Sequence, residues 1–208
     1  LPLPGDERFA YQLYLTDTAQ WFRRDFAAFP RHQGYLKADS EQTQELRRSY
    51  REKYGKRPLI GISWRTATNT KVSAHKTLEL ADWEPLLGGR DATFVSLQYG
   101  PVHREIGDAG RKLKTTIVRD ATVDPVKDMD SFASQVAAMD LVITTSNATA
   151  HMAGSLNVPV WTLAPKGFGS MWHWFLDRED SPWYPSVRLL RQPVPGDWKF
   201  VLNRASIM

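Results

Sequence analysis

The sequence predicts an α/β fold built on a doubly wound, mainly parallel β-sheet. Short runs of apolar and β-branched residues, which are typical of buried strands, recur along the chain and alternate with segments of helical periodicity. The stretch from Leu141 to Pro165 contains a whole strand–turn–helix–strand unit, and its crossover is long enough to join two parallel strands. The 208 residues suffice for one domain of this class with a sizeable core.

The first 34 residues do not follow this alternation. They include an aromatic segment, residues 10–29, in which Tyr11, Phe22, Phe26 and Phe29 have roughly helical spacing. We therefore expect a helical leader over residues 1–34, followed by the α/β domain over residues 35–208. The aromatic segment is expected to pack on that domain or on a partner.

The first half of the domain begins with a polar helix. Asp39 or Ser40 suits its start, the helix is expected over residues 41–54, and Gly55 suits its end. Its basic residues indicate a solvated helix face rather than a nucleic-acid site. The next elements are predicted to be a strand at 59–64, a loop at 66–75, a helix at 78–87 and a strand at 93–97.

The second half continues the alternation. Asp128 or Asp130 is expected to begin a helix, and the pair separated by one residue also resembles a metal-site signal. Because the pair directly precedes helical periodicity, we interpret it as a helix cap and expect no metal. The other predicted elements are a helix at 103–113, a strand at 115–118, a strand at 141–145, a helix at 148–156, a strand at 159–163, a loop at 166–170, a strand at 187–190 and a helix at 198–203.

The turn from Ser146 to Thr149 is a candidate phosphate site. It joins the carboxyl end of a strand to the amino end of a helix, where free N–H groups and the helix dipole favour an anion. Thr149 adds a hydroxyl, and His151 adds an imidazole on the first helical turn. The same pattern fits an ordinary capped helix with a packed histidine and no ligand, and both interpretations stay open.

Composition excludes several classes of protein. The net charge of +4 fits an anionic ligand, but it also fits a generic basic surface. No apolar run approaches the length of a membrane span, and there is no Walker loop, hydrolase elbow or Cys/His metal cluster. The chain has no cysteine and no visible signal peptide, so a cytoplasmic protein is expected.

The stretch SNATAHMAGSLNVPVWTLAP, which begins at Ser146, resembles the donor-binding signature of GT-B glycosyltransferases of the heptosyltransferase type (family 9). Such domains often form the catalytic part of tetratricopeptide-repeat glycosyltransferases. Further pieces of the family pattern occur in the expected order, at residues 61–65, 94–99, 181–186 and 191–198. The resemblance covers roughly residues 35–202.

The resemblance implies the C-terminal, Rossmann-like half of a GT-B fold, which binds a nucleotide-diphosphate sugar as substrate without metal or other cofactor. The residues implied for the diphosphate are Ser146, Asn147, Ala148, Thr149, His151, Arg65 and Lys76. The residues implied for the nucleoside are Gln98, Trp172, His173 and Trp174. The general base of such enzymes usually comes from the N-terminal domain, so no catalytic residue is assigned. Residues 10–29 are expected to lead out of that domain or to bind a protein partner.

A second class of function stays open, namely a degenerate, non-catalytic transferase domain used for protein binding or assembly. Ser146 stands where the family usually has Asp, and His173 stands where it usually has Arg. A dinucleotide-dependent oxidoreductase is disfavoured, because no Gly-x-Gly-x-x-Gly follows the first strand at Trp64. The sequence does not determine the donor sugar, its base, the acceptor or the oligomeric state, and it leaves open whether the chain is an active enzyme.

Overall fold

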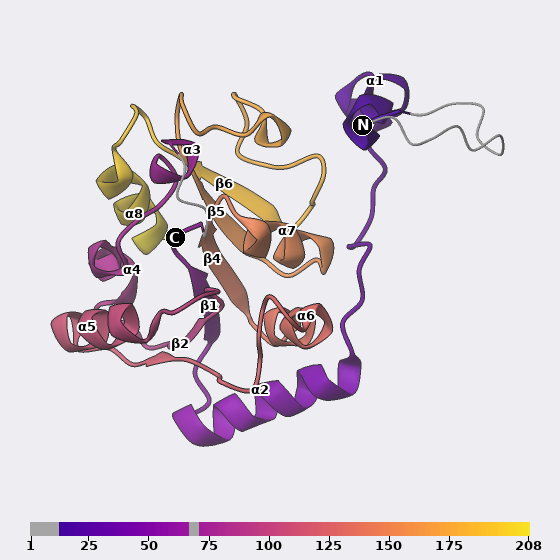
Figure 1. Ribbon diagram of the computed structural model, residues 1–208. Coiled ribbons are helices and arrows are strands. Elements are labelled where there is room, and N and C mark those ends of the chain that lie inside the picture. The colour runs from indigo at the N-terminus through magenta and orange to yellow at the C-terminus, as the bar shows by residue number, and fades with distance from the viewer. Residues whose placement is uncertain (1–12, 67–70) are drawn as a thin grey trace. The chain divides into compact units, whose positions relative to one another are not determined.

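The computed structural model describes residues 13–66 and 71–208 (Figure 1). The chain divides into two units, one that ends at Arg31 and one that runs from His32 to Met208. The predicted boundary between residues 34 and 35 stays a prediction.

The larger unit contains a six-stranded sheet in which every pairing is parallel (Figure 1). The strand order is β3-β2-β1-β4-β5-β6. The predicted α/β, doubly wound class is therefore confirmed. The strands are β1 (Leu59–Ser63), β2 (Thr93–Ser96), β3 (Ile117–Val118), β4 (Leu141–Thr145), β5 (Val160–Ala164) and β6 (Val187–Arg191).

The direction of winding changes between β1 and β4, which lie side by side at the centre of the sheet. From β1 the chain proceeds outward to β2 and β3, and from β4 it proceeds outward in the opposite direction to β5 and β6. Connections therefore diverge on either side of the β1–β4 pair, and in open α/β sheets the crevice outside the carboxyl ends of the strands at such a point is where ligands bind. Ser63 ends β1 and Thr145 ends β4, so the residues that follow them lie at this point.

Helices cover both faces of the sheet (Figure 1). One face is packed by α2 (Ser40–Tyr54), α6 (Met129–Ala137) and α7 (Ala148–Ser155). The other face is packed by the 3₁₀ helix η3 (Leu80–Trp83), α4 (Glu84–Leu87), α5 (His103–Leu113) and α8 (Trp198–Ser206).

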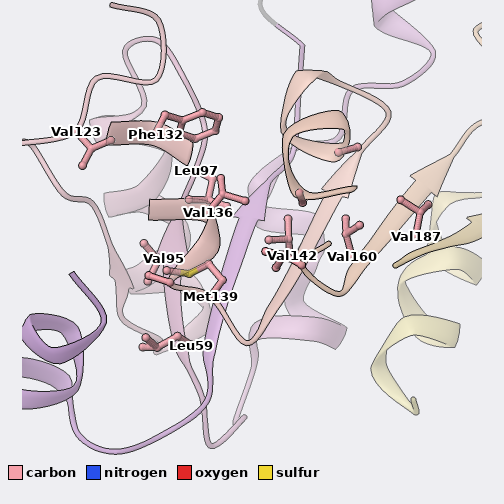
Figure 2. Packing of buried hydrophobic residues seen from close by; sticks show 14 of the residues in the cluster. Leu59, Val95, Leu97, Val123, Phe132, Val136, Met139, Val142, Val160 and Val187 are labelled. Atoms are coloured by element: carbon pink, nitrogen blue, oxygen red, sulfur yellow. The ribbon is translucent and has the colours of Figure 1, made fainter. Parts of the chain in front are cut away.

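Alternation along the strands divides the core into two clusters. Val142 of β4 packs beneath α6 and α7, whereas its neighbour Ile143 packs on the opposite face. Val95 and Phe94 of β2 are divided in the same way. This follows from the two-residue period of side chains in a strand. Figure 2 shows the cluster beneath α6 and α7, in which Val95, Val142 and Val160 of the sheet lie with side chains of α6.

Two predicted elements differ from the structure. The helix expected at 78–87 is divided into η3 and α4, and Pro85 lies in the first turn of α4. Proline lacks an amide hydrogen and is accepted only at the start of a helix, so it marks a new beginning rather than an interior position. The loop expected at 66–75 contains a short helix, α3 (Lys71–Ala74), and its residues 67–70 lie outside the described part of the chain.

The leader is helical only in short pieces. Its described part contains the 3₁₀ helix η1 (Leu15–Thr18), α1 (Ala19–Phe22) and the 3₁₀ helix η2 (Phe26–Ala28), while residues 10–12 lie outside the described residues. Pieces of three or four residues cannot support a continuous apolar stripe. Large side chains of this unit accordingly remain exposed, including Tyr14, Phe22 and Phe26.

Candidate functional site

Asn147 joins the ends of the two central strands. Its Nδ2 donates to Ser63 Oγ (2.8 Å) and to the carbonyl of Arg65 (3.2 Å). Its Oδ1 accepts from the amide of Thr149 (3.0 Å) and lies 3.0 Å from Thr144 Oγ1. These contacts use both donors and both acceptor positions of the amide. Asn147 is thus the N-cap of α7, and all hydrogen-bonding positions of its buried side chain are used within the protein.

Gln98 performs the corresponding task at the end of β2. Its Oε1 accepts from the amides of Trp64 (2.9 Å) and Arg65 (3.0 Å) and from Ser63 Oγ (3.0 Å). Ser63 therefore accepts a hydrogen bond from Asn147 and passes one to Gln98. The structure places Gln98 just beyond the end of β2, where its carbonyl oxygen holds the backbone after β1 in place. Its predicted contact with a nucleoside stays a prediction.

Arg65 lies against α5. Its guanidinium pairs with Glu105, with Nη2 2.9 Å from Oε1, and Trp64 Nε1 donates to Oε2 of the same carboxylate (2.6 Å). The predicted diphosphate contact therefore has a competitor inside the protein, because the positive charge of Arg65 is already compensated.

Lys76, in contrast, has an uncompensated charge. It is half-buried, and burial lowers the pKa of its ammonium. Among the residues that the structure describes, none forms a hydrogen bond or an ion pair with this ammonium. Its charge contributes to lowering the pKa of His151 and of His173, which places the three groups in one electrostatic neighbourhood.

The two histidines are held neutral by their surroundings. Burial is the main cause of the lowered pKa of His151, and the charge of Lys76 adds to it. Burial, His151 and Lys76 together lower the pKa of His173 to about 4. The two rings meet edge to face, with their centroids 4.8 Å apart. At neutral pH, Lys76 is thus the cation of this cluster.

The two predicted tryptophans have different roles. Trp174 is buried, donates from Nε1 to Ser146 Oγ (2.8 Å) and stacks on His151 with centroids 5.0 Å apart. It packs on the turn after β4, so its ring is covered. Trp172 lies in the same 3₁₀ helix, η4 (Trp172–Trp174), but is 59% exposed and presents an indole to solvent.

The first turn of α7 contains an unusual polar atom. The hydroxyl of Thr149 is fully buried and has no hydrogen-bond partner within the described residues. The amide of Thr149 is bonded to the cap, so the side chain is the unsatisfied group. A buried polar atom without a partner is costly unless another group or a water supplies one.

A cleft that the sequence motifs did not indicate lies beside the crevice. It has a volume of about 530 Å³ and follows the ends of β2 and β3. Ser96 lines it with a buried, unpartnered hydroxyl, and Arg119 and Lys127 contribute cations. The position of Arg119 in the sequence could have indicated this cleft, because Arg119 directly follows a predicted strand and so lies at the same edge of the sheet as Gln98.

Two general properties of the described residues complete the site. No cluster of three or more His, Asp or Glu side chains there is arranged to hold a metal ion. None of the helices in the described parts is both long and apolar enough to cross a membrane.

Comparison with known proteins gives one curated relative and several solved structures. No family model matches the chain. The chain is 32% identical over 200 residues to Protein FlbA of Caulobacter vibrioides, an alignment that covers 96% of this chain and 33% of that protein. The chain therefore spans about a third of the length of this relative.

The solved structures show the fold. A glycosyl transferase of family 9 from Veillonella parvula superposes with a TM-score of 0.55 at 15% identity, covering 78% of this chain and 44% of that one. The E. coli ADP-heptose lps heptosyltransferase II gives 0.53 at 14% identity, covering 83% and 52%. The fold of the chain is accordingly that of the Rossmann-like half of a GT-B, heptosyltransferase-like fold.

Proposed function

We propose that this domain binds the nucleotide-diphosphate part of a sugar donor in a metal-independent GT-B glycosyltransferase. The observation that carries the proposal is Lys76, a half-buried cation beside the first turn of α7 that has no partner among the described residues. A charge that is partly removed from water is costly unless something compensates it. An anion at the amino end of α7 supplies that compensation.

The diphosphate would lie at the turn after β4. The amino end of α7 offers backbone N–H groups and the positive end of the helix dipole, and Lys76 adds a full charge. Negative charge develops on the diphosphate as the sugar leaves, so the same groups would stabilise the leaving group. Asn147 would act by holding this turn in shape rather than by contacting the ligand through its amide.

Two places suit the nucleoside. The cleft at the ends of β2 and β3 has a volume of about 530 Å³, within the range of small-molecule sites. The exposed indole of Trp172 offers a face on which a base could stack. The buried Trp174 is better explained as support for Ser146 and His151.

The chain spans about half the length of the two solved glycosyltransferase structures. In the proposed enzyme, the acceptor site and the general base would come from outside this domain. The leader has exposed aromatic residues, Tyr14, Phe22 and Phe26, which would contact the N-terminal GT-B domain or a protein partner.

One observation favours the second function, a non-catalytic module. Two groups expected to meet the donor are used internally, since Arg65 pairs with Glu105 and Ser146 Oγ accepts from Trp174. A domain that has lost its ligand would keep such contacts for stability. Binding of a nucleotide discriminates between the two functions.

The test is calorimetric titration of the chain with UDP, GDP and ADP. We expect one of them to bind, and we expect Lys76→Gln to weaken that binding at least about tenfold, the effect of losing one charge-assisted contact. Lys112→Gln removes an exposed cation from α5 and serves as the matched control with unchanged affinity. No binding of any nucleotide at millimolar concentration would favour the non-catalytic module, and equal affinity of Lys76→Gln and wild type would exclude the proposed role of Lys76.

A further inference from the structure

Four side chains form a continuous hydrogen-bonded chain behind the proposed site. Ser155 Oγ lies 2.7 Å from the carbonyl oxygen of His151 and 2.8 Å from the hydroxyl of Tyr35. The Tyr35 hydroxyl lies 3.3 Å from that of Tyr184, which in turn lies 2.9 Å from His151 Nδ1. This row of hydrogen bonds thus leaves α7 at Ser155 and returns to it at His151.

The backbone holds the members of this chain in position. The amide of Tyr35 donates to the carbonyl of Ser155 (2.9 Å), and so does the next amide, that of Leu36 (3.0 Å). The rings of Tyr35 and Tyr184 stack with centroids 6.1 Å apart. Gly154 lets Tyr184 approach the helix, because a Cβ at this position would lie 2.6 Å from its ring.

The protons that these four hydrogen bonds need can be counted. A carbonyl oxygen only accepts, so the 2.7 Å contact with the His151 carbonyl requires the single proton of Ser155. A hydroxyl can donate in either direction, so for the two contacts between hydroxyls to hold one proton each, Tyr35 must donate to Ser155 and Tyr184 must donate to Tyr35. The proton of Tyr184 is thereby used, so the proton between Tyr184 and His151 has to come from Nδ1. Only this arrangement gives each of the four contacts its own proton.

We infer that Ser155, Tyr35 and Tyr184 are positioning residues that hold neutral His151 as its Nδ1–H tautomer and leave Nε2 as a hydrogen-bond acceptor. The opposite tautomer would require Tyr184 to donate to His151, and the single proton of Tyr35 would then serve only one of its two contacts, the one with Ser155 or the one with Tyr184. Burial and Lys76 lower the pKa of His151, so the neutral form is the relevant one near neutral pH.

The tautomer changes which ligand group His151 could bind, and this step rests on the proposed function. A bare Nε2 does not donate to an ionised phosphate oxygen. It instead matches a ligand group that carries a hydrogen, such as a hydroxyl of the donor sugar. Contact with the diphosphate then depends on Lys76 and on the amino end of α7.

The tautomer is measured by ¹⁵N NMR of the histidine ring in the ligand-free chain at pH 8.5, with His151→Asn identifying the His151 signals. We expect Nδ1 to have the shift of a protonated nitrogen and Nε2 that of a bare one. In Ser155→Ala, Tyr35 loses its acceptor and is free to donate to Tyr184, which then donates to His151. The two shifts should therefore exchange, although the substitution lies three hydrogen bonds away.

Ser134→Ala is the matched control. Ser134 is also a buried helical serine, and it donates to the carbonyl four residues earlier, that of Asp130 (3.1 Å), without touching this chain. It should leave the ring shifts of His151 unchanged. Tyr35→Phe alters a largely exposed side chain and should produce the same exchange as Ser155→Ala.

A protonated Nε2 in the wild-type chain would overturn the inference, and so would shifts that stay in place in both Ser155→Ala and Tyr35→Phe. Because the measurement needs no nucleotide, its outcome is independent of whether a donor binds. Failure of this inference and failure of the proposed function can thus be told apart.

Discussion

At the scale of single residues, Asn147 has the greatest structural importance in the site. Its one amide connects the end of β1 to the end of β4 and caps α7. Side chains at a strand switch point usually meet ligands, yet here the amide is consumed by the framework. The geometry of the turn therefore depends on this residue even if no atom of its side chain touches a donor.

Asn147→Ala should lower the free energy of unfolding by about 2–4 kcal/mol, because it removes a helix cap and leaves buried partners unsatisfied. Asp197→Ala is the control, since Asp197 caps α8 through one bond to the amide of Phe200 and makes no bridge between strands. The control should lose about 1 kcal/mol. Urea titration gives both values, and equal losses would show that the bridge to β1 contributes nothing.

The lowered pKa values of the two histidines predict how stability depends on pH. In the unfolded chain these imidazoles titrate near the ordinary value of 6.5, whereas folding lowers the pKa of His173 to about 4 and also lowers that of His151. The unfolded state then binds more protons in this interval, so folding is favoured above pH 6.5 and loses stability as the pH falls toward 4.

The measurement is urea unfolding at several pH values between 4 and 7. His173→Asn should flatten part of the slope, because it removes one of the two perturbed groups. His103→Asn alters an exposed histidine at the start of α5 and should leave the slope as it is. A slope that is identical in His173→Asn and wild type would contradict the prediction.

At the scale of elements, the glycines of α7 and α5 differ in what surrounds them. Gly154 faces the ring of Tyr184, whereas the nearest atom to a Cβ at Gly107 would be the end of the Arg111 side chain, 3.6 Å away. Helix propensity alone favours alanine at both positions. At Gly154, packing decides whether alanine stabilises or destabilises the protein, because the ring of Tyr184 is held against the helix.

Gly154→Ala should destabilise the protein by about 1–3 kcal/mol through overpacking, despite the gain in propensity. Gly107→Ala should raise stability by about 0.5–1 kcal/mol, since nothing obstructs the added methyl group. Thermal unfolding followed by circular dichroism compares the two. A stabilising Gly154→Ala would mean that Tyr184 moves aside at little cost.

At the scale of the whole molecule, both hydrophobic clusters and all six strands lie between His32 and Met208. A unit with its own sheet and two covered faces has what independent folding requires. Removal of residues 1–31 should therefore leave the urea midpoint of the remaining chain unchanged. A lower midpoint or a broader transition would show that the leader contributes to the folded domain.

The fold class and most elements followed from the sequence because they depend on neighbours in the chain. Alternation between apolar runs and capped helical segments placed β4, α7 and β5 within a residue or two. Asp128, one of the two residues expected to begin its helix, is the cap of α6, and Asn147 from the predicted turn caps α7, since a cap bonds to an amide two or three residues away. The prediction of one helix over 78–87 was wrong because Pro85 begins a new helix and does not continue the one before it.

The site depended on contacts that no local pattern contains. Arg65, which follows β1, pairs with Glu105 of α5, and Trp174 donates to Ser146. The hydroxyls of Tyr35 and Tyr184 meet although 149 residues separate them in the sequence. Each of these pairs exists only because the order of strands in the sheet brings distant segments to one edge. By itself, the sequence determined which residues reach that edge. Only the tertiary structure decided which of them bind one another and which, like Lys76, have no partner within residues 13–66 and 71–208. Hydrogen bonds and charge compensation depend on distances in space rather than along the chain.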